Sequence, residues 1–159
     1  MRKDNIYLEK EKQLKATLGF LKAIKSNLSK NLAVEIAECA ADNYILSIYK
    51  DVFKGTKPGT QNRFNRFRNF YENYSSLISY CEIVESTKNK IEVLFHRCPY
   101  FEILKNEKLS HFAESSCNSD LTFTNKLMPG VQFSRKSSIA QGDPICRMIW
   151  SFNYKRKSS

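Results

Sequence analysis

The strongest constraint on the fold is a change of sequence pattern at Leu77. After this residue, two pairs of β-rich segments flank a stretch of helical pattern. Segments 77–86 ("LISYCEIVES") and 91–98 ("IEVLFHRC") surround a polar turn and predict a hairpin. Segments 129–140 and 145–154 form the second pair. The sequence therefore predicts an α+β fold with a four-stranded, mostly antiparallel sheet. This sheet packs against an amino-terminal helical half and a helix inserted between the two strand pairs.

The amino-terminal half contains three segments of helical pattern. Residues 5–28 alternate apolar positions with lysine and glutamate, which predicts an amphipathic helix with a basic exposed face. Residues 31–54 predict a second helix, which ends at the glycines and proline of "KGTKPGT". In "QNRFNRFRNFYENY", the aromatic spacing of three and four favours a buried face with arginines at its rim. The weaker interpretation is that arginines and aromatics grip single-stranded nucleic acid.

The length of 159 residues and a hydrophobic content of 42% fit one domain with its own core. We expect a single domain over 1–159, divided into a helical part (1–75), a strand-helix-strand part (76–154) and a basic tail (155–159). Lysine and arginine cluster in the first thirty residues and in the tail, which together dominate the net charge of +10. Their distribution favours a solvated helix face and a solubilising tail over a nucleic-acid surface.

The cysteines indicate a reduced compartment. There are five, with no CxxC pair, and no signal-peptide pattern opens the chain, so we expect a cytoplasmic protein. The most apolar stretch is interrupted by Glu35, Glu38 and Asp42, which argues against a membrane span.

The helical stretch between the strand pairs carries the first candidate chemistry. Counting by three and four from Leu109 predicts one apolar face, made of Ala113, Cys117, Asp120, Leu121 and Thr124. A carboxylate on a buried face is costly without a partner, so Asp120 predicts either a site or a carboxylate that caps the helix end.

The predicted strands add further candidates. Alternation places His96 and Cys98 on one face of the second strand, where an imidazole and a thiol can form a base and nucleophile pair. On the last strand, Cys146 begins an inward row that continues through Met148, Trp150 and Phe152. On the preceding strand, Arg135 falls among inward apolar residues, which predicts a carboxylate partner from the protein or from a ligand.

Metal binding is the weaker interpretation of these residues. Three cysteines with His96 would match the ligand number of zinc. The cysteines are spaced 19 and 29 residues apart, however, and no paired ligand motif occurs. We therefore expect no metal and no other cofactor.

The order of three short motifs resembles the L-2-amino-thiazoline-4-carboxylic acid hydrolase family. The motifs are "RCPY", "CNSD" and "PGVQFSRKSSIAQGDPIC", and the likeness is concentrated in residues 93–150. The matching positions are Cys98, Pro99, Cys117, Asp120, Arg135, Gly142, Asp143 and Cys146. Family members often continue after the last cysteine with an acidic residue and phenylalanine, where this chain has Arg147 and Met148.

The resemblance implies the hydrolytic opening of a small cyclic amidine in bacterial cysteine metabolism. The substrate would be a 2-aminothiazoline-4-carboxylate and the product N-carbamoylcysteine. Asp120 or Asp143 would hold the protonated amidine while a thiolate or an activated water attacks carbon 2. Among the thiols, Cys117 is favoured over Cys146 and Cys98 as nucleophile, because it alone has an aspartate within one helical turn on its face.

The remaining predicted site residues would bind substrate. Arg135 would hold the substrate carboxylate or lower a thiol pKa, and Cys98 and His96 would line the site. The expected partner is thus a small molecule with a carboxylate, with no membrane; self-association is left open. Two alternatives are a small-molecule sensor without catalysis on the same scaffold, and, less favoured, a basic nucleic-acid-binding accessory protein.

Overall fold

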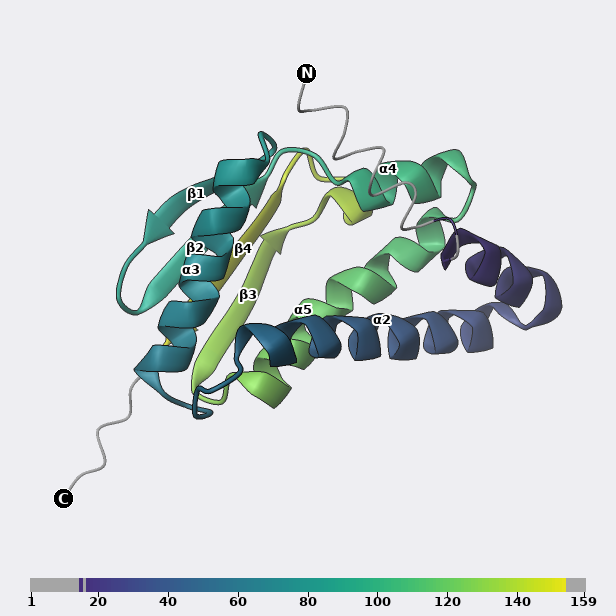
Figure 1. Cartoon of the computed structure of the whole chain (residues 1–159). Helices are drawn as coiled ribbons and strands as arrows, with labels where there is room; N and C mark the ends of the chain where they lie inside the picture. Colours follow the sequence, from purple (N-terminus) through teal and green to yellow (C-terminus); the bar gives the residue numbers. More distant parts are fainter. Residues whose placement is uncertain (1–14, 16, 154–159) are drawn as a thin grey trace.

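The computed structural model describes residue 15 and residues 17–153 (Figure 1). Residues 17–27 are helical, in agreement with the predicted first helix, whose remaining residues between 5 and 14 lie outside the described part of the chain. The predicted basic tail, 155–159, also lies outside it.

Two long helices follow, each with a side-chain cap. Helix α2 spans Lys30–Val52 and begins after Ser29, whose hydroxyl accepts a hydrogen bond from Leu32 N. Helix α3 spans Gln61–Leu77 and is capped in the same way by Thr60. Between them, Gly55 and Gly59 adopt positive φ angles of 77° and 69°, which glycine tolerates without strain.

The second half forms a four-stranded antiparallel sheet. Its strands are β1 (Cys81–Ser86), β2 (Lys90–Phe95), β3 (Val131–Ser137) and β4 (Cys146–Phe152), in the order β1-β2-β4-β3. Helices α4 (Pro99–Asn106) and α5 (Ala113–Leu127) lie between the two strand pairs in sequence, with a 3-10 turn, Ser110–Phe112, between them. A second 3-10 turn, Ile139–Gln141, precedes β4. The predicted α+β fold is confirmed.

One face of the sheet is covered by α3 (Figure 1). The inward row of β4 alternates as predicted, and Trp150 at its centre is fully buried. Helix α3 contributes Phe64, Phe67 and Tyr71 to the same core, with Phe67 in edge contact with Trp150 at 5.1 Å between ring centroids. These buried rings cannot stack on nucleotide bases, so the aromatic spacing of this segment is explained by packing.

A second hydrophobic core joins the helices. It contains Leu18, Leu21 and Ile24 of the first helix with residues of α2, α4 and the start of α5. The long contact between α2 and α5 uses small buried residues, which let two helix backbones approach closely. These residues are Ala33, Ala37, Ser115 and Ser119.

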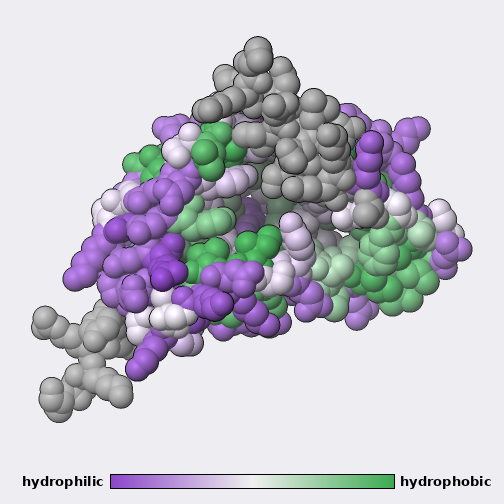
Figure 2. All heavy atoms as spheres, in the orientation of Figure 1, coloured by the Kyte–Doolittle hydropathy of each residue, from purple (hydrophilic) through white to green (hydrophobic). Residues whose placement is uncertain are grey.

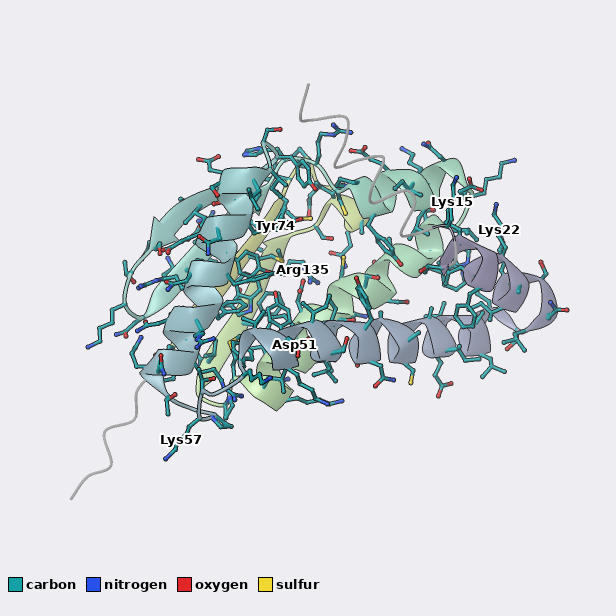
Figure 3. The ribbon with its side chains drawn as sticks, in the orientation of Figure 1. Lys15, Lys22, Asp51, Lys57, Tyr74 and Arg135 are labelled. Carbon is teal, nitrogen blue, oxygen red and sulfur yellow. The ribbon has the colours of Figure 1, made fainter. Side chains whose placement is uncertain are left out.

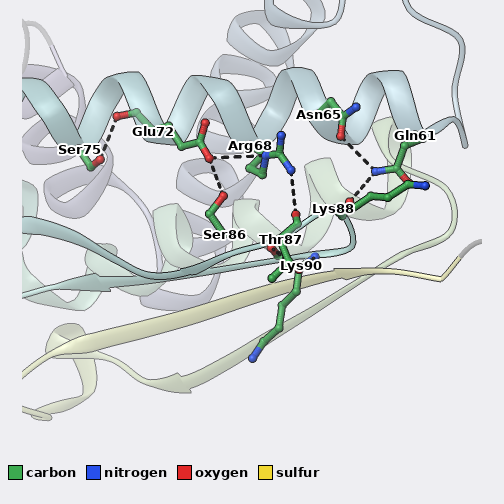
Figure 4. Close-up of polar contacts among 9 residues, drawn as sticks. All are labelled: Gln61, Asn65, Arg68, Glu72, Ser75, Ser86, Thr87, Lys88 and Lys90. Carbon is green, nitrogen blue, oxygen red and sulfur yellow. Dashed lines mark hydrogen bonds and ion pairs between the residues drawn. The ribbon is translucent and has the colours of Figure 1, made fainter.

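Polar contacts fix α3 to the β1–β2 hairpin (Figure 4). Gln61 Nε2 donates to Lys88 O at 2.5 Å, and Arg68 Nη1 donates to Thr87 O at 2.9 Å. Further along the helix, Glu72 accepts a hydrogen bond from Ser86 Oγ. Contacts at both ends of the segment from Gln61 to Glu72 thus hold the hairpin against α3.

Several predicted details are wrong. Strand β2 ends at Phe95, so His96 and Cys98 do not share a strand face; Cys98 instead caps α4. Leu121 is 50% exposed, because the buried face of α5 turns away from it. Arg63 is no solvated rim residue: its guanidinium donates to Leu127 O at 2.6 Å and to Thr56 O at 2.8 Å. It therefore ties the start of α3 to the end of α5.

We expect the buried contact between Trp150 and Thr124 to stabilise the junction of sheet and α5. Trp150 Nε1 donates to Thr124 Oγ1 at 3.0 Å, and that hydroxyl donates to Asp120 O at 2.7 Å. Replacing Thr124 with valine keeps the shape but leaves the indole N–H without an acceptor. Urea denaturation should show a loss of about 1–3 kcal/mol for T124V. The control T124S keeps the hydroxyl and should lose less; equal losses would contradict the role of the hydrogen bond.

Candidate active site

An ion pair between α5 and β3 forms the centre of the candidate site. Arg135 Nη2 donates to Asp120 Oδ2 at 2.8 Å, and it also donates to the Cys117 carbonyl oxygen. The side chains remain 18% and 20% exposed for Arg135 and Asp120, respectively. The carboxylate partner predicted for the inward arginine is thus supplied by the protein, and both members of the pair retain access to solvent.

Local structure explains how the two side chains meet. Arg135 stands opposite Met148 in the sheet register, on the inward face of β3. The register shifts between Arg135 and Ser137, where β3 bends before the 3-10 turn. On α5, Cys117 and Asp120 lie three residues apart and so share a face. Figure 3 places Arg135 in the middle of the view, between α3 and α5, where Figure 2 shows a hollow in the surface.

The site lies at the junction of the two hydrophobic cores. Along α5, Ala113 belongs to the second core, which joins the helices, and Phe123 belongs to the core between the sheet and α3. Cys117 and Asp120 occupy the turns between them. The polar side chains therefore lie where one core ends and the other begins.

Burial sets the protonation behaviour of both groups. It raises the pKa of Asp120 to about 6, and the Arg135 guanidinium counteracts only part of this effect. Burial likewise raises the pKa of the Cys117 thiol to about 11, again against the influence of Arg135. At neutral pH, Asp120 is mainly ionised and Cys117 is protonated.

Two other predicted cysteines lie near Cys117. Cys98 and Cys146 both act electrostatically on Cys117, and Cys146 acts on Cys98. Cys98 Sγ accepts a hydrogen bond from Phe101 N at 3.4 Å, and Cys146 Sγ accepts one from Ile139 N at 3.1 Å. The structure thus brings together the predicted thiols, Asp120 and Arg135.

A family model decides the classification of the chain. The model described as L-2-amino-thiazoline-4-carboxylic acid hydrolase matches residues 12–150. The chain belongs to this family. A search of curated proteins finds no match.

Asp143, one of the predicted site residues, has a local structural role. Its Oδ2 accepts a hydrogen bond from Ser138 N at 2.7 Å, and its own N–H donates to Ser138 O at 3.1 Å. The preceding Gly142 has a φ of 100°, which only glycine adopts readily. Asp143 is exposed and closes the turn that leads into Cys146. Its predicted role as a second carboxylate remains a prediction.

His96 forms a separate pair in this hydrolase family member. Its Nε2 lies 2.9 Å from Glu82 Oε2, and both side chains are largely exposed. His96 therefore interacts across the β1–β2 hairpin, and no contact joins it to Asp120 or Arg135. Its predicted role in substrate binding receives no support from this contact.

Sequence reasoning missed the tyrosines around the site. Tyr49 of α2 and Tyr71 of α3 are buried, and the charge of Asp120 contributes to the raised pKa of each. Tyr100 of α4 hydrogen-bonds to Ser116 and interacts electrostatically with Cys117 and Cys98. The only sequence signal was tyrosine on the predicted buried helix faces, which indicates packing as readily as a site.

The described residues contain no metal centre and no membrane span. Among them, no three histidine, cysteine, aspartate or glutamate side chains gather closely enough to hold a metal ion. Within the same part of the chain, no helix has the length and hydrophobicity needed to cross a bilayer. A shallow depression lined by Gly59, Arg63 and Pro129 lies at the opposite end of the sheet from Arg135.

We expect Arg135 to limit the pKa of Asp120. In R135M the carboxyl stays buried without its cation, so its folded-state pKa should rise further above the unfolded value of about 4. A raised folded pKa favours the protonated folded state, so stability falls as pH rises from about 4 to that pKa. R135M should therefore lose more stability at pH 8, by about 3 kcal/mol, than at pH 5.

Urea denaturation at both pH values measures this difference. The double variant R135M/D120N has no carboxylate to strand, so its loss should depend little on pH. An equal loss for R135M at pH 5 and pH 8 would contradict the proposed coupling.

Proposed function

We propose that this chain hydrolyses a small cyclic amidine that carries a carboxylate, such as 2-aminothiazoline-4-carboxylate, with Asp120 as general base. The observation that supports this most is the partly exposed Asp120–Arg135 pair beside Cys117, at positions on which the sequence resemblance to the family rests. Membership of the hydrolase family gives the reaction class. The pair supplies a proton acceptor and a cation side by side.

Asp120 suits the role of base because its pKa of about 6 lies near neutrality. It would be ionised at pH 7 and able to accept a proton from water during attack. The Cys117 thiol, with a pKa of about 11, would rarely be ionised, because the Asp120 carboxylate is too weak a base to deprotonate it. We therefore favour an attacking water over the cysteine nucleophile that sequence reasoning favoured, and place Cys117 in the wall of the site.

Arg135 would orient the substrate through its carboxylate. Its two hydrogen bonds to Asp120 and Cys117 both use Nη2, and Nε and Nη1 make none with the described residues. These N–H groups suit a carboxylate, whose two oxygens match the planar fork of a guanidinium. The same contact would place the ring beside Asp120.

The reaction then balances without a cofactor. Asp120 takes a proton from water as the oxygen bonds to carbon 2 of the protonated amidine. The tetrahedral intermediate collapses with cleavage of the carbon–sulfur bond, and the proton held by Asp120 goes to the departing sulfur. The proton of the intermediate's hydroxyl group is released to solvent as the carbonyl forms, which returns the proton that the amidine brought. The product carries a free thiol and a carbamoyl group on nitrogen, with one water added and no change of oxidation state.

We expect incubation with 2-aminothiazoline-4-carboxylate to yield a product one water heavier by mass spectrometry. In H₂¹⁸O the label should enter the carbamoyl oxygen. D120N should lose about 10²-fold or more in kcat, because a positioned base contributes 10²–10⁴-fold, whereas C117A should keep most of its activity. The matched controls are D51N and C39A, at exposed positions on α2. Full activity in D120N would overturn the assignment, and loss in C117A with a covalent adduct would restore the thiol route.

The pH dependence gives an independent test. The value of kcat/KM should rise between pH 5 and pH 7 with a midpoint near 6, because the free enzyme must hold Asp120 ionised. The rate should be followed with wild type at constant ionic strength. A profile flat through this range would exclude Asp120 as the base, and ligand binding without product would favour the sensor alternative.

A further inference from the structure

Near the Asp120–Arg135 pair, two buried tyrosine hydroxyls share one hydrogen bond. One of the two hydroxyl hydrogens is therefore left without an acceptor in the described part of the chain. Tyr49 Oη donates to Tyr71 Oη at 3.2 Å, and the two residues are 5% and 6% exposed. Two hydroxyls that share one hydrogen bond still hold a second hydrogen. No acceptor for it occurs among the residues described, which is unusual for a buried donor.

The packing around this pair places it next to the catalytic turn of α5. The Tyr49 ring stacks on Phe123 at 4.0 Å, one turn after Asp120. The Tyr71 ring lies 5.2 Å from Trp150, whose indole bonds to Thr124 and through it to the Asp120 carbonyl. Both tyrosines are therefore held rigidly by groups that also hold Asp120.

Asp120 keeps one carboxylate oxygen that makes no hydrogen bond with the described residues. Asp120 Oδ2 accepts from Arg135, while Oδ1 makes no hydrogen bond with the described residues. Each tyrosine interacts electrostatically with Asp120, yet neither makes a direct hydrogen bond with it. One bridging molecule would satisfy both groups, because it could accept from the hydroxyl donor on one side and donate to the carboxylate on the other.

We propose that the Tyr71 hydroxyl, fixed by Tyr49, donates its hydrogen to the water or substrate atom on which Asp120 acts. Tyr71 is thus a positioning donor of this site, and Tyr49 sets the direction of its hydroxyl. A water held between Tyr71 and Asp120 has its oxygen oriented and its proton directed at the carboxylate. Such preorganised donors lower the barrier without reorganisation during the reaction.

Titration of Asp120 tests this proposal without any substrate. Arg135 from β3 lowers the pKa of Asp120, and Asp120 in turn interacts with Cys117 on α5, Tyr49 from α2 and Tyr71 from α3; Tyr71 also interacts with Cys81 of β1. A donor that reaches the carboxylate through water stabilises its ionised form. Y71F should therefore raise the pKa of Asp120, followed by NMR of ¹³Cγ-labelled aspartate and assigned with D120N.

The control is Y44F, which removes a hydroxyl from a 64% exposed tyrosine on α2 and should leave the titration unchanged. Y49F keeps the Tyr71 hydroxyl but frees its direction, and should raise the pKa of Asp120 by less than Y71F does. If Y71F does not fold, the titration of Asp120 in Y49F tests the proposal. An Asp120 titration identical to wild type in the folded variants would overturn the proposal.

Turnover gives a second readout, and this part rests on the proposed function. Y71F should lower kcat by about 10²-fold, the typical loss for one preorganised donor, with a smaller change in KM. If the wild type is inactive but Y71F shifts the pKa of Asp120, the proposed function is refuted and the donor role of Tyr71 stands. An active wild type matched by Y71F in kcat would refute the donor role alone.

Discussion

The structure depends on how it accommodates one carboxylate on the buried face of α5. An ionised Asp120 in this position is unfavourable alone, and Arg135 offsets that cost from the inward face of β3. The same guanidinium also fixes the position of the helix, because it donates a hydrogen bond to the Cys117 carbonyl oxygen one turn earlier. Trp150 and Thr124 fix the next turn. Helix α5 is therefore held against the sheet by polar contacts where the two hydrophobic cores meet.

This environment separates the two candidate reactive groups by their proton affinity. Partial burial disfavours charge on both Asp120 and Cys117, so both pKa values rise. The carboxyl begins low enough that its raised pKa of about 6 still leaves it ionised at neutral pH. The thiol begins near 9, and its raised pKa of about 11 leaves it protonated. One physical effect thus favours the aspartate as the proton acceptor and disfavours the thiol as the nucleophile.

The fold could be predicted from the sequence where the spacing of apolar residues is regular. The site could be predicted where a charged residue falls on a face that should be buried. The strand pairs, the inserted helix and the inward row from Cys146 to Phe152 follow from alternation and helical spacing. An aspartate and an arginine on predicted buried faces each required a partner, and the structure pairs them with one another. The predicted strand face shared by His96 and Cys98 was wrong because β2 ends at Phe95, and strand ends are set by sheet pairing that alternation does not encode. Tyr49 and Tyr71 were missed because a tyrosine on a buried face looks the same whether its hydroxyl packs or functions.

The location of the site at the junction of two cores explains why it can remain both ordered and open. Within either core, a polar side chain would be surrounded by apolar neighbours and lose solvent; at the junction, Asp120 and Arg135 keep about a fifth of their surface exposed. Rigid aromatic packing on one side, through Phe123, Tyr49 and Trp150, fixes the helix that carries Asp120. The thiols of Cys98 and Cys146 enter from other elements, where each accepts a backbone N–H. Because α4, α5, β3 and β4 each supply one part, the site forms only when both cores have assembled.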